Sequence, residues 1–337
     1  MSFFNYLFRL LKEVKNPPLF LYHLFHFANI NIPLFLSRII GKRNCSDYLK
    51  DNIEDVLFYT YDGSCQVVHP DMTVFGEKCV VVFTPYPYGM EEYENPCLYI
   101  GDSLKSLEEI LVPLDVQAEH KRGYHMSDPS IASFKDSIYC VYRDTINTRD
   151  FIYLKKIKCN DGSYIVSDRV LLIHKTDEYV LSPAILLDAN LIYMYHVKTD
   201  KHESQLILNT FDRTTYIHHQ TYDVTIIDAP EEYYLWHIGI SSDNDQDKVV
   251  DSDCRLKGLF LYISQSNNKL FRLFMTQNTA GDLLSWKIIK EVNIPREIKD
   301  VMKFPYKSCF EPCTGKILLS FRDFKDRNRL ALIDCDR

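Results

Sequence analysis

The stretch Val68-His69-Pro70-Asp71-Met72-Thr73-Val74-Phe75 is followed by a turn at residues 76–78 and then by the apolar run Cys79-Val80-Val81-Val82-Phe83. A short polar head therefore leads into two consecutive strands. The same order of a polar head and apolar strands returns in residues 127–144, 181–197, 235–263 and 309–323. Five repeats spaced by roughly 55 to 70 residues, each with room for four strands, are typical of propeller blades. The sequence predicts an all-β fold, a five-bladed β-propeller.

Two segments lie outside this regular pattern. Residues 55–62 form a predicted strand that precedes the first repeat, and the last repeat is one strand short. We expect residues 55–62 to complete the last blade as its outer strand, because closing the ring in this way removes free sheet edges. The hydrophilic run of residues 241–255 predicts a solvated loop; it has no spacing typical of a calcium site.

Charge and cysteine usage restrict the function. The chain has 337 residues and a net charge of -7, which argues against a nucleic-acid partner because no basic stripe is available to displace counterions. Its ten cysteines contain no C-x-x-C pair, so neither a zinc site nor a redox dithiol is predicted. Cysteines inside apolar strands indicate free thiols in a reducing compartment, and the expected location is cytoplasmic.

The first 46 residues differ from the rest. Aromatic and leucine side chains recur at helical spacing there, and basic residues outnumber acidic ones. We expect a helical segment at 1–46 and the propeller at 47–337. Two interpretations of the segment stay open: a helical cap packed on a propeller face or in a dimer interface, or a peripheral anchor at the inner face of the membrane. Neither a membrane-spanning helix nor a signal peptide is predicted, because no apolar run is long enough and no cleavage site follows.

The heads of the repeats hold the candidate site residues. In a propeller the first strand of each blade lines the central channel, so residues at these heads converge. The heads carry His69, Asp71, Ser127, Asp128, Ser182, Trp236, His237 and Glu311. Convergent carboxylates are what acid/base cleavage of a glycosidic bond requires. The alternative is that Asp and Ser before proline only form turns at strand entry.

These motifs resemble a known family. His69-Pro70-Asp71, Ser127-Asp128-Pro129 and Ser182-Pro183 are similar to the blade openings of the five-bladed propellers of glycoside hydrolase family 43 and its relatives, families 32 and 130. The resemblance covers roughly residues 55–337, is moderately specific for the fold, and leaves the N-terminal segment unexplained.

The resemblance implies roles for individual residues. Asp71 matches the general base, and Asp128 matches the aspartate that orients and tunes the site. Ser182 stands where the family has the glutamate that acts as general acid, so Glu94, Glu178 and Glu311 are the candidates for that role. His237 resembles a histidine that such propellers place in the channel, where it holds water or a metal ion. No other cofactor is expected.

The remaining candidates would bind the substrate. They are His69, Tyr86, Asn95, Arg143, Ser182, Trp236, His237 and Arg322. For the two arginines a structural ion pair is an equally good interpretation. We therefore expect an enzyme that acts on a glycan, with hydrolysis and glycosyl transfer both open, in the metabolism of a surface polysaccharide or glycolipid. A non-catalytic glycan-binding propeller and a protein-interaction scaffold are the alternatives. If Asp71 is the base, Asp71→Asn abolishes turnover without lowering thermal stability.

Overall fold

The computed structural model describes residues 54–56, 58, 60–62, 64–117, 123–160, 163–175, 178–199, 203–242, 248–250, 255–267 and 269–335. The predicted helical segment at 1–46, its possible membrane contact and the domain boundary at residue 47 lie outside these residues. The described helices are short: α3 (Arg296–Lys299) and the 3-10 helices η3 (Pro87–Gly89) and η4 (Glu91–Tyr93). None of the described helices has the length and hydropathy of a membrane span. The predicted all-β fold is confirmed.

The opening stretch of the sequence forms the first antiparallel unit. It consists of β2 (Val67–Phe75), β3 (Lys78–Pro85), β4 (Cys97–Gly101) and β5 (Leu107–Leu111), paired in that order. Gly76 allows the tight turn between β2 and β3 because it adopts a φ of 62°. β2 and β3 are buried along nearly their whole length, as expected for strands with neighbours on both faces.

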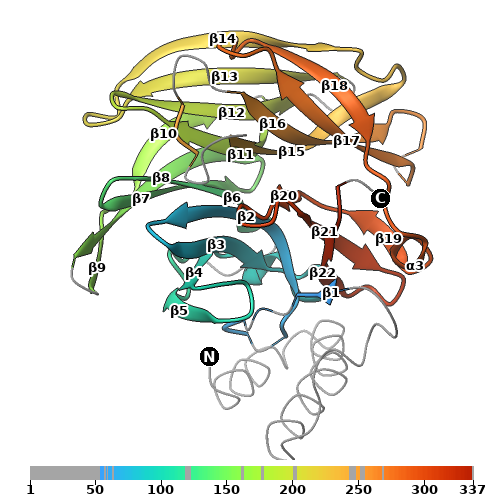
Figure 1. Cartoon of the computed structure of the whole chain (residues 1–337), viewed down its shortest axis with the longest axis horizontal. Coiled ribbons are helices and arrows are strands. Elements are labelled where there is room, and N and C mark those ends of the chain that lie inside the picture. The colour runs from blue at the N-terminus through green and yellow to red at the C-terminus, as the bar shows by residue number, and fades with distance from the viewer. Residues whose placement is uncertain are drawn as a thin grey trace, which may run out of the picture.

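Four further units follow along the chain (Figure 1). The second has β6 (Tyr124–Phe134), β7 (Ser137–Ile146), β8 (Arg149–Asn160), β9 (Ser163–Val166) and β10 (Val170–Lys175). The third has β11 (Tyr179–Leu187), β12 (Leu191–Thr199), β13 (Ser204–Asp212) and β14 (His218–Ile227). The fourth has β15 (Tyr233–Ser242), β16 (Leu256–Ser264), β17 (Phe271–Asn278) and β18 (Ser285–Glu291). β14 and β18 pair in parallel, so the third and fourth units form one eight-stranded sheet. The fifth has β19 (Met302–Pro305), β20 (Cys309–Phe310), β21 (Ile317–Asp323) and β22 (Asn328–Ile333).

The last unit is completed from the other end of the chain. β1 (Glu54–Asp55) pairs with β22 through Glu54↔Leu332 and Asp55↔Ala331. This confirms the predicted closure, although the pairing strand is shorter than the expected 55–62 and residues 61–62 form a turn. Closure ties the start of the described chain to its end, so this sheet edge is covered.

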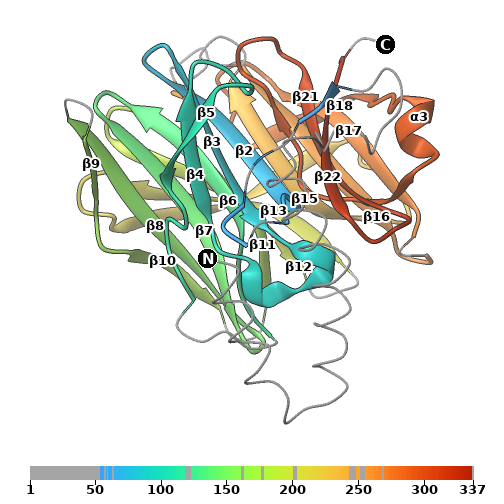
Figure 2. The ribbon, with the colours of Figure 1, turned by 90° about the horizontal axis from the view of Figure 1, so that it is seen from below.

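The units are arranged around a centre. β2 contacts β6, β6 contacts β11, β11 contacts β15, β15 contacts β20, and β20 contacts β2. Figure 2 shows the sheets fanned side by side, from β9 and β10 through β2–β5 to β21 and β22. Apolar residues of adjacent sheets pack between them, as in the cluster that joins Val80 and Val82 of β3 to Ile131 of β6 and Ile138 of β7. Each sheet therefore has apolar residues on both faces, and its inner edge strand faces the centre.

The prediction of a solvated loop at residues 241–255 is wrong for part of the run. Ser241 and Ser242 end strand β15 and are buried. Lys248 is only 1% exposed, although the run that contains it is rich in Asp and Ser. Val249 forms a parallel bridge with Leu187 of β11, which draws this segment inward.

Candidate functional site

Three strand heads share one unusual conformation. His69, Asp128 and Ser182 each precede a proline and have φ of 54°, 53° and 51°. Each lies where the pairing register of its inner strand shifts, between Val68 and Asp71 in β2 and at the matching places in β6 and β11. A positive φ is costly for residues other than glycine and persists only where the surrounding structure fixes it. His69, Asp128 and Ser182 therefore share the same backbone conformation at equivalent positions of their strands.

Asp71 lies two residues beyond its head, at the position of Ser130 in β6. Its carboxylate is 1% exposed and accepts hydrogen bonds from the Met72 and Ile131 N–H groups, at 3.0 and 2.9 Å, and from the Ser130 hydroxyl. The Lys248 Nζ donates to both carboxylate oxygens at 2.6 Å. Asp71 is thus one half of a buried ion pair, and both of its carboxylate oxygens already have hydrogen-bond partners. This arrangement indicates a structural role, because the carboxylate is not exposed to a substrate.

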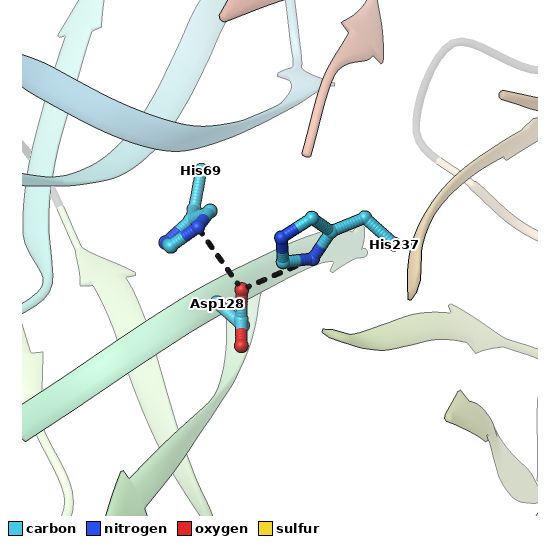
Figure 3. Close-up of side chains that lie close together, drawn as sticks. All are labelled: His69, Asp128 and His237. Atoms are coloured by element: carbon cyan, nitrogen blue, oxygen red, sulfur yellow. Dashed lines mark ion pairs between the residues drawn. The ribbon is translucent and has the colours of Figure 1, made fainter. Parts of the chain in front are cut away.

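Asp128 lies at the centre of the polar cluster. Its Oδ1 is 3.5 Å from His69 Nε2 and 3.6 Å from His237 Nδ1, and Figure 3 shows the two rings on either side of it. Its Oδ2 is 3.2 Å from the Arg143 guanidinium and 3.5 Å from the Ser182 N–H. Burial would raise the pKa of Asp128, but the cationic Arg143 and the facing histidines hold it well below its usual range. Asp128 is therefore ionised at neutral pH.

Glu94 approaches the same cluster from the first unit, directly after η4. Its Oε1 is 3.7 Å from His69 Nδ1, so the His69 imidazole stands between Glu94 and Asp128. Glu94 is 4% exposed, and burial, together with the negative charge of Asp128, raises its pKa well above the usual value. Burial also lowers the pKa of His69 to about 4. The surroundings thus shift the pKa values of Glu94 and Asp128 in opposite directions. This difference favours a protonated Glu94 beside an ionised Asp128.

A second buried lysine, Lys307, forms hydrogen bonds with two of the strand heads. Lys307 Nζ donates to the carbonyl oxygens of Pro129 and Pro183 at 2.8 and 2.9 Å. The side chain is 1% exposed, and burial lowers its pKa. One ammonium group thus ties the head of β6 to the head of β11. Sequence reasoning missed Lys307 and Lys248, because neither lies in a repeated motif.

Aromatic side chains that are partly exposed border the cluster. Tyr306 meets His69 edge to face at a centroid distance of 5.5 Å and meets Tyr86 at 6.2 Å. Trp236 meets His237 at 5.7 Å. The Arg322 guanidinium lies over Gly89, where an added Cβ would come within 3.4 Å of it, and its Nε is 3.2 Å from Asp326. Among the predicted binding residues, Tyr86 and Trp236 thus flank the cluster, and Arg322 is linked to its border by a side-chain hydrogen bond with Tyr306.

Other predicted residues lie apart from it. The side chain of Asn95 donates to the Tyr61 hydroxyl at 2.8 Å and accepts from the Gln117 N–H at 2.9 Å. The carboxylate of Glu311 accepts from the Cys313 and Thr314 N–H groups of its own turn. These contacts are structural, as is the ion pair of Glu178 with Lys198 at 2.8 Å.

For Arg143 the two predicted interpretations are substrate binding and a structural ion pair, and the structure shows an ion pair that lies within the site. Its guanidinium pairs with Asp128 and also donates to the Ser127 hydroxyl at 2.9 Å. It is therefore a structural partner within the site and holds one oxygen of Asp128 in place.

Sequence comparison finds no match, whereas structural comparison finds solved structures with a similar fold. No family model matches the chain, and no curated protein matches it. An α-L-arabinanase from Cellvibrio cellulosa, solved with arabinohexaose, is 13% identical, with a TM-score of 0.52 over 79% of this chain and 91% of that one. An endo-arabinase from Bacteroides thetaiotaomicron is 11% identical, with a TM-score of 0.52 over 86% and 98%. A family 43 β-1,3-galactosidase solved with galactodeoxynojirimycin is 9% identical, with a TM-score of 0.53 over 83% and 94%.

These likenesses establish the fold. The chain is a β-propeller of the type found in glycoside hydrolase family 43, as the sequence motifs predicted. The blade number of five and the roles of the individual site residues stay predictions.

Proposed function

We propose that this protein is a carbohydrate-active propeller that binds a glycan beside Glu94, Asp128 and His69. One observation carries the proposal: ionisable side chains from separate sheets converge on a single buried cluster that partly exposed aromatic side chains border. Aromatic rings present apolar faces to sugars, and buried charged groups fix the orientation of hydroxyl groups. The propeller fold supports the same substrate class, although fold alone does not define a reaction.

The chemistry that we propose is acid/base cleavage or transfer of a glycosyl bond. Glu94 would give its proton to the glycosidic oxygen as the bond from that oxygen to the anomeric carbon breaks. Water or an acceptor hydroxyl would attack the carbon, and the proton that it loses would return to the Glu94 carboxylate. Asp128 would stay ionised and tune the charge around Glu94 and His69. We do not assign the general base to Asp71, because Lys248 already occupies both of its carboxylate oxygens.

A glycan-binding propeller without turnover is the second candidate. Its supporting observation is that two of the three X-Pro heads carry His69 and Ser182 rather than carboxylates. The Ser182 hydroxyl is engaged in hydrogen bonds with the backbone of Ile238, accepting from its N–H at 2.9 Å and donating to its carbonyl at 3.1 Å. It therefore has no part in proton transfer, and the site would retain binding groups only.

One experiment separates the two candidates. The full chain is incubated with arabinohexaose, with β-1,3-linked galacto-oligosaccharides and with a panel of surface polysaccharides, and products are detected by mass spectrometry. For the enzyme we expect products from the wild type, none from Glu94→Gln, and full activity from Glu178→Gln, which alters a surface ion pair. Binding without product in the wild type supports the second candidate. If the wild type neither binds nor cleaves any glycan of the panel, the proposal is contradicted.

The cellular setting belongs to the proposal as well. We propose a cytoplasmic protein, in contact with the inner face of the membrane through residues 1–46; the supporting observation is their basic and aromatic composition. Liposome co-sedimentation of the full chain tests this contact. Replacing Arg9, Lys12 and Lys15 by glutamate should release the protein from anionic vesicles, and unchanged partitioning contradicts it.

A further inference from the structure

The fifth unit brings two cations to the border of the site. Its strand β21 contacts β2, and Tyr306, between β19 and β20, meets His69 edge to face at 5.5 Å. Lys307 follows Tyr306 in the sequence, and Arg322 forms a side-chain hydrogen bond with Tyr306. A lysine and an arginine therefore stand next to the aromatic residue that borders the cluster.

Lys307 forms no ion pair with a carboxylate of the described residues. Its ammonium group donates instead to the backbone carbonyl oxygens of Pro129 and Pro183. Its charge acts on the site, since burial lowers the pKa of His69 and His237 and Lys307 is among the cations that lower it further. A buried charge without a counter-ion is costly, and it favours an anion nearby.

Arg322 shares its only carboxylate partner among the described residues. Asp326 Oδ1 lies 3.2 Å from Arg322 Nε and 2.6 Å from Lys303 Nζ, so one negative charge faces two positive charges. The Arg322 side chain is 24% exposed, and its guanidinium group is held against Gly89. Asp326 and Tyr306 cannot occupy every N–H donor of a guanidinium group. A planar fork of donors held in one place suits a carboxylate or a phosphate group.

We propose that the glycan bound beside Tyr306 is acidic, and that Arg322 binds a carboxylate or phosphate group of this glycan near the positive charge of Lys307. This inference rests on the proposed function and names the substrate class. A neutral sugar would leave the excess positive charge of the fifth unit uncompensated, whereas an acidic sugar supplies the missing counter-ion. The excess is local, because the chain as a whole has a net charge of -7.

Pairs of polysaccharides that differ only in their acidic groups test this inference. The full chain is titrated by calorimetry with polysaccharides that contain uronic acids, and with the same polysaccharides after chemical reduction of their carboxyl groups. Polysaccharides with pendant phosphate are compared in the same way before and after phosphatase treatment. We expect the acidic member of a pair to bind at least about 10-fold more tightly, as hydrogen bonds to a charged group predict. The difference should shrink at high salt, and the pair that shows it identifies the acidic group as carboxylate or phosphate.

Arg322→Gln should weaken binding of the acidic member by about 10- to 100-fold and change binding of the neutral member by less than about threefold. The matched control is Arg272→Gln, which removes a guanidinium group that pairs with Glu291 on the surface at 2.7 Å and should alter neither affinity. If Arg322→Gln does not fold, the comparison of paired polysaccharides with the wild type still decides.

Equal affinity of the wild type for both members, or binding of neutral glycans only, overturns the inference and leaves the proposed function standing. A folded Arg322→Gln variant that keeps the full preference for the acidic member overturns it as well. If the wild type binds no glycan of either kind, the inference and the proposed function both fail.

Discussion

Replacing Lys248 with methionine tests the role that the structure gives to Asp71. The side chains of this pair are each 2% exposed, and the ammonium group lies 2.6 Å from both carboxylate oxygens. Lys248→Met keeps the length of the side chain and leaves a buried carboxylate with only the Ser130 hydroxyl and two backbone N–H groups. Breaking a buried ion pair in this way costs about 3–5 kcal/mol of unfolding free energy, because the remaining charge stays buried.

The assay is thermal unfolding followed by circular dichroism. A chain of 337 residues has an unfolding entropy of roughly 0.7 kcal/mol/K, so the loss corresponds to a fall in Tm of roughly 4–7 °C. Asp71→Asn should cost a similar amount, since it leaves the Lys248 ammonium unpaired. This differs from the expectation for a catalytic base, whose replacement would leave stability unchanged.

The surface pair Lys303–Asp326 is the matched control. It has the same 2.6 Å separation, but its side chains are 49% and 48% exposed, so Lys303→Met should cost only about 0–1 kcal/mol. The double variant Asp71→Asn/Lys248→Met should lose less stability than the sum of the single variants, because it leaves no lone buried charge. A loss at Lys248 no larger than that at Lys303, or strict additivity in the double variant, would refute the reasoning.

Three further predictions concern other parts of the fold. Gly239→Ala should destabilise the protein by about 1–3 kcal/mol in urea unfolding, because an added Cβ would lie 2.1 Å from the Ser308 carbonyl oxygen; a neutral effect would contradict this close approach. Burial lowers the pKa of His196 to about 3, so the unfolded state takes up a proton below pH 6.5 while the folded state does not, and stability falls as the pH drops through this range. His196→Gln should therefore reduce the stability lost between pH 7 and pH 5 by about 2 kcal/mol, and an unchanged pH dependence would argue against a neutral buried imidazole. Ser182→Ala should cost about 1–3 kcal/mol in the same unfolding assay, since it leaves the buried Ile238 N–H without its acceptor; equal stability would mean that water replaces the hydroxyl.

The fold was predictable because its signal is local and repeated. A polar head followed by apolar strands recurs along the chain, and even the closure by β1 follows from counting strands in the last unit. The site was predictable only in part. Asp128 and His69 stand at X-Pro heads, and a proline motif is visible in the sequence. Pairing register is not visible in the sequence. Asp71 stands two residues after the head at His69, so the structure gives it the position of Ser130 in β6 rather than that of Asp128.

The buried lysines show the same limit. Lys248 and Lys307 reach the centre from segments far from their partners in the sequence, and a lysine in a hydrophilic or irregular stretch normally predicts a solvated side chain. Only the folded arrangement brings Lys248 to Asp71, 177 residues away.

The most direct test of the central claim is a crystal structure of the full chain soaked with arabinohexaose or with whichever glycan of the panel binds best. We predict that a sugar ring lies against Tyr306, with a glycosidic oxygen or hydroxyl group within hydrogen-bond distance of the Glu94 carboxyl group. A glycan bound at another place on the propeller, with the surroundings of Glu94, His69 and Asp128 unoccupied by sugar, would contradict the account.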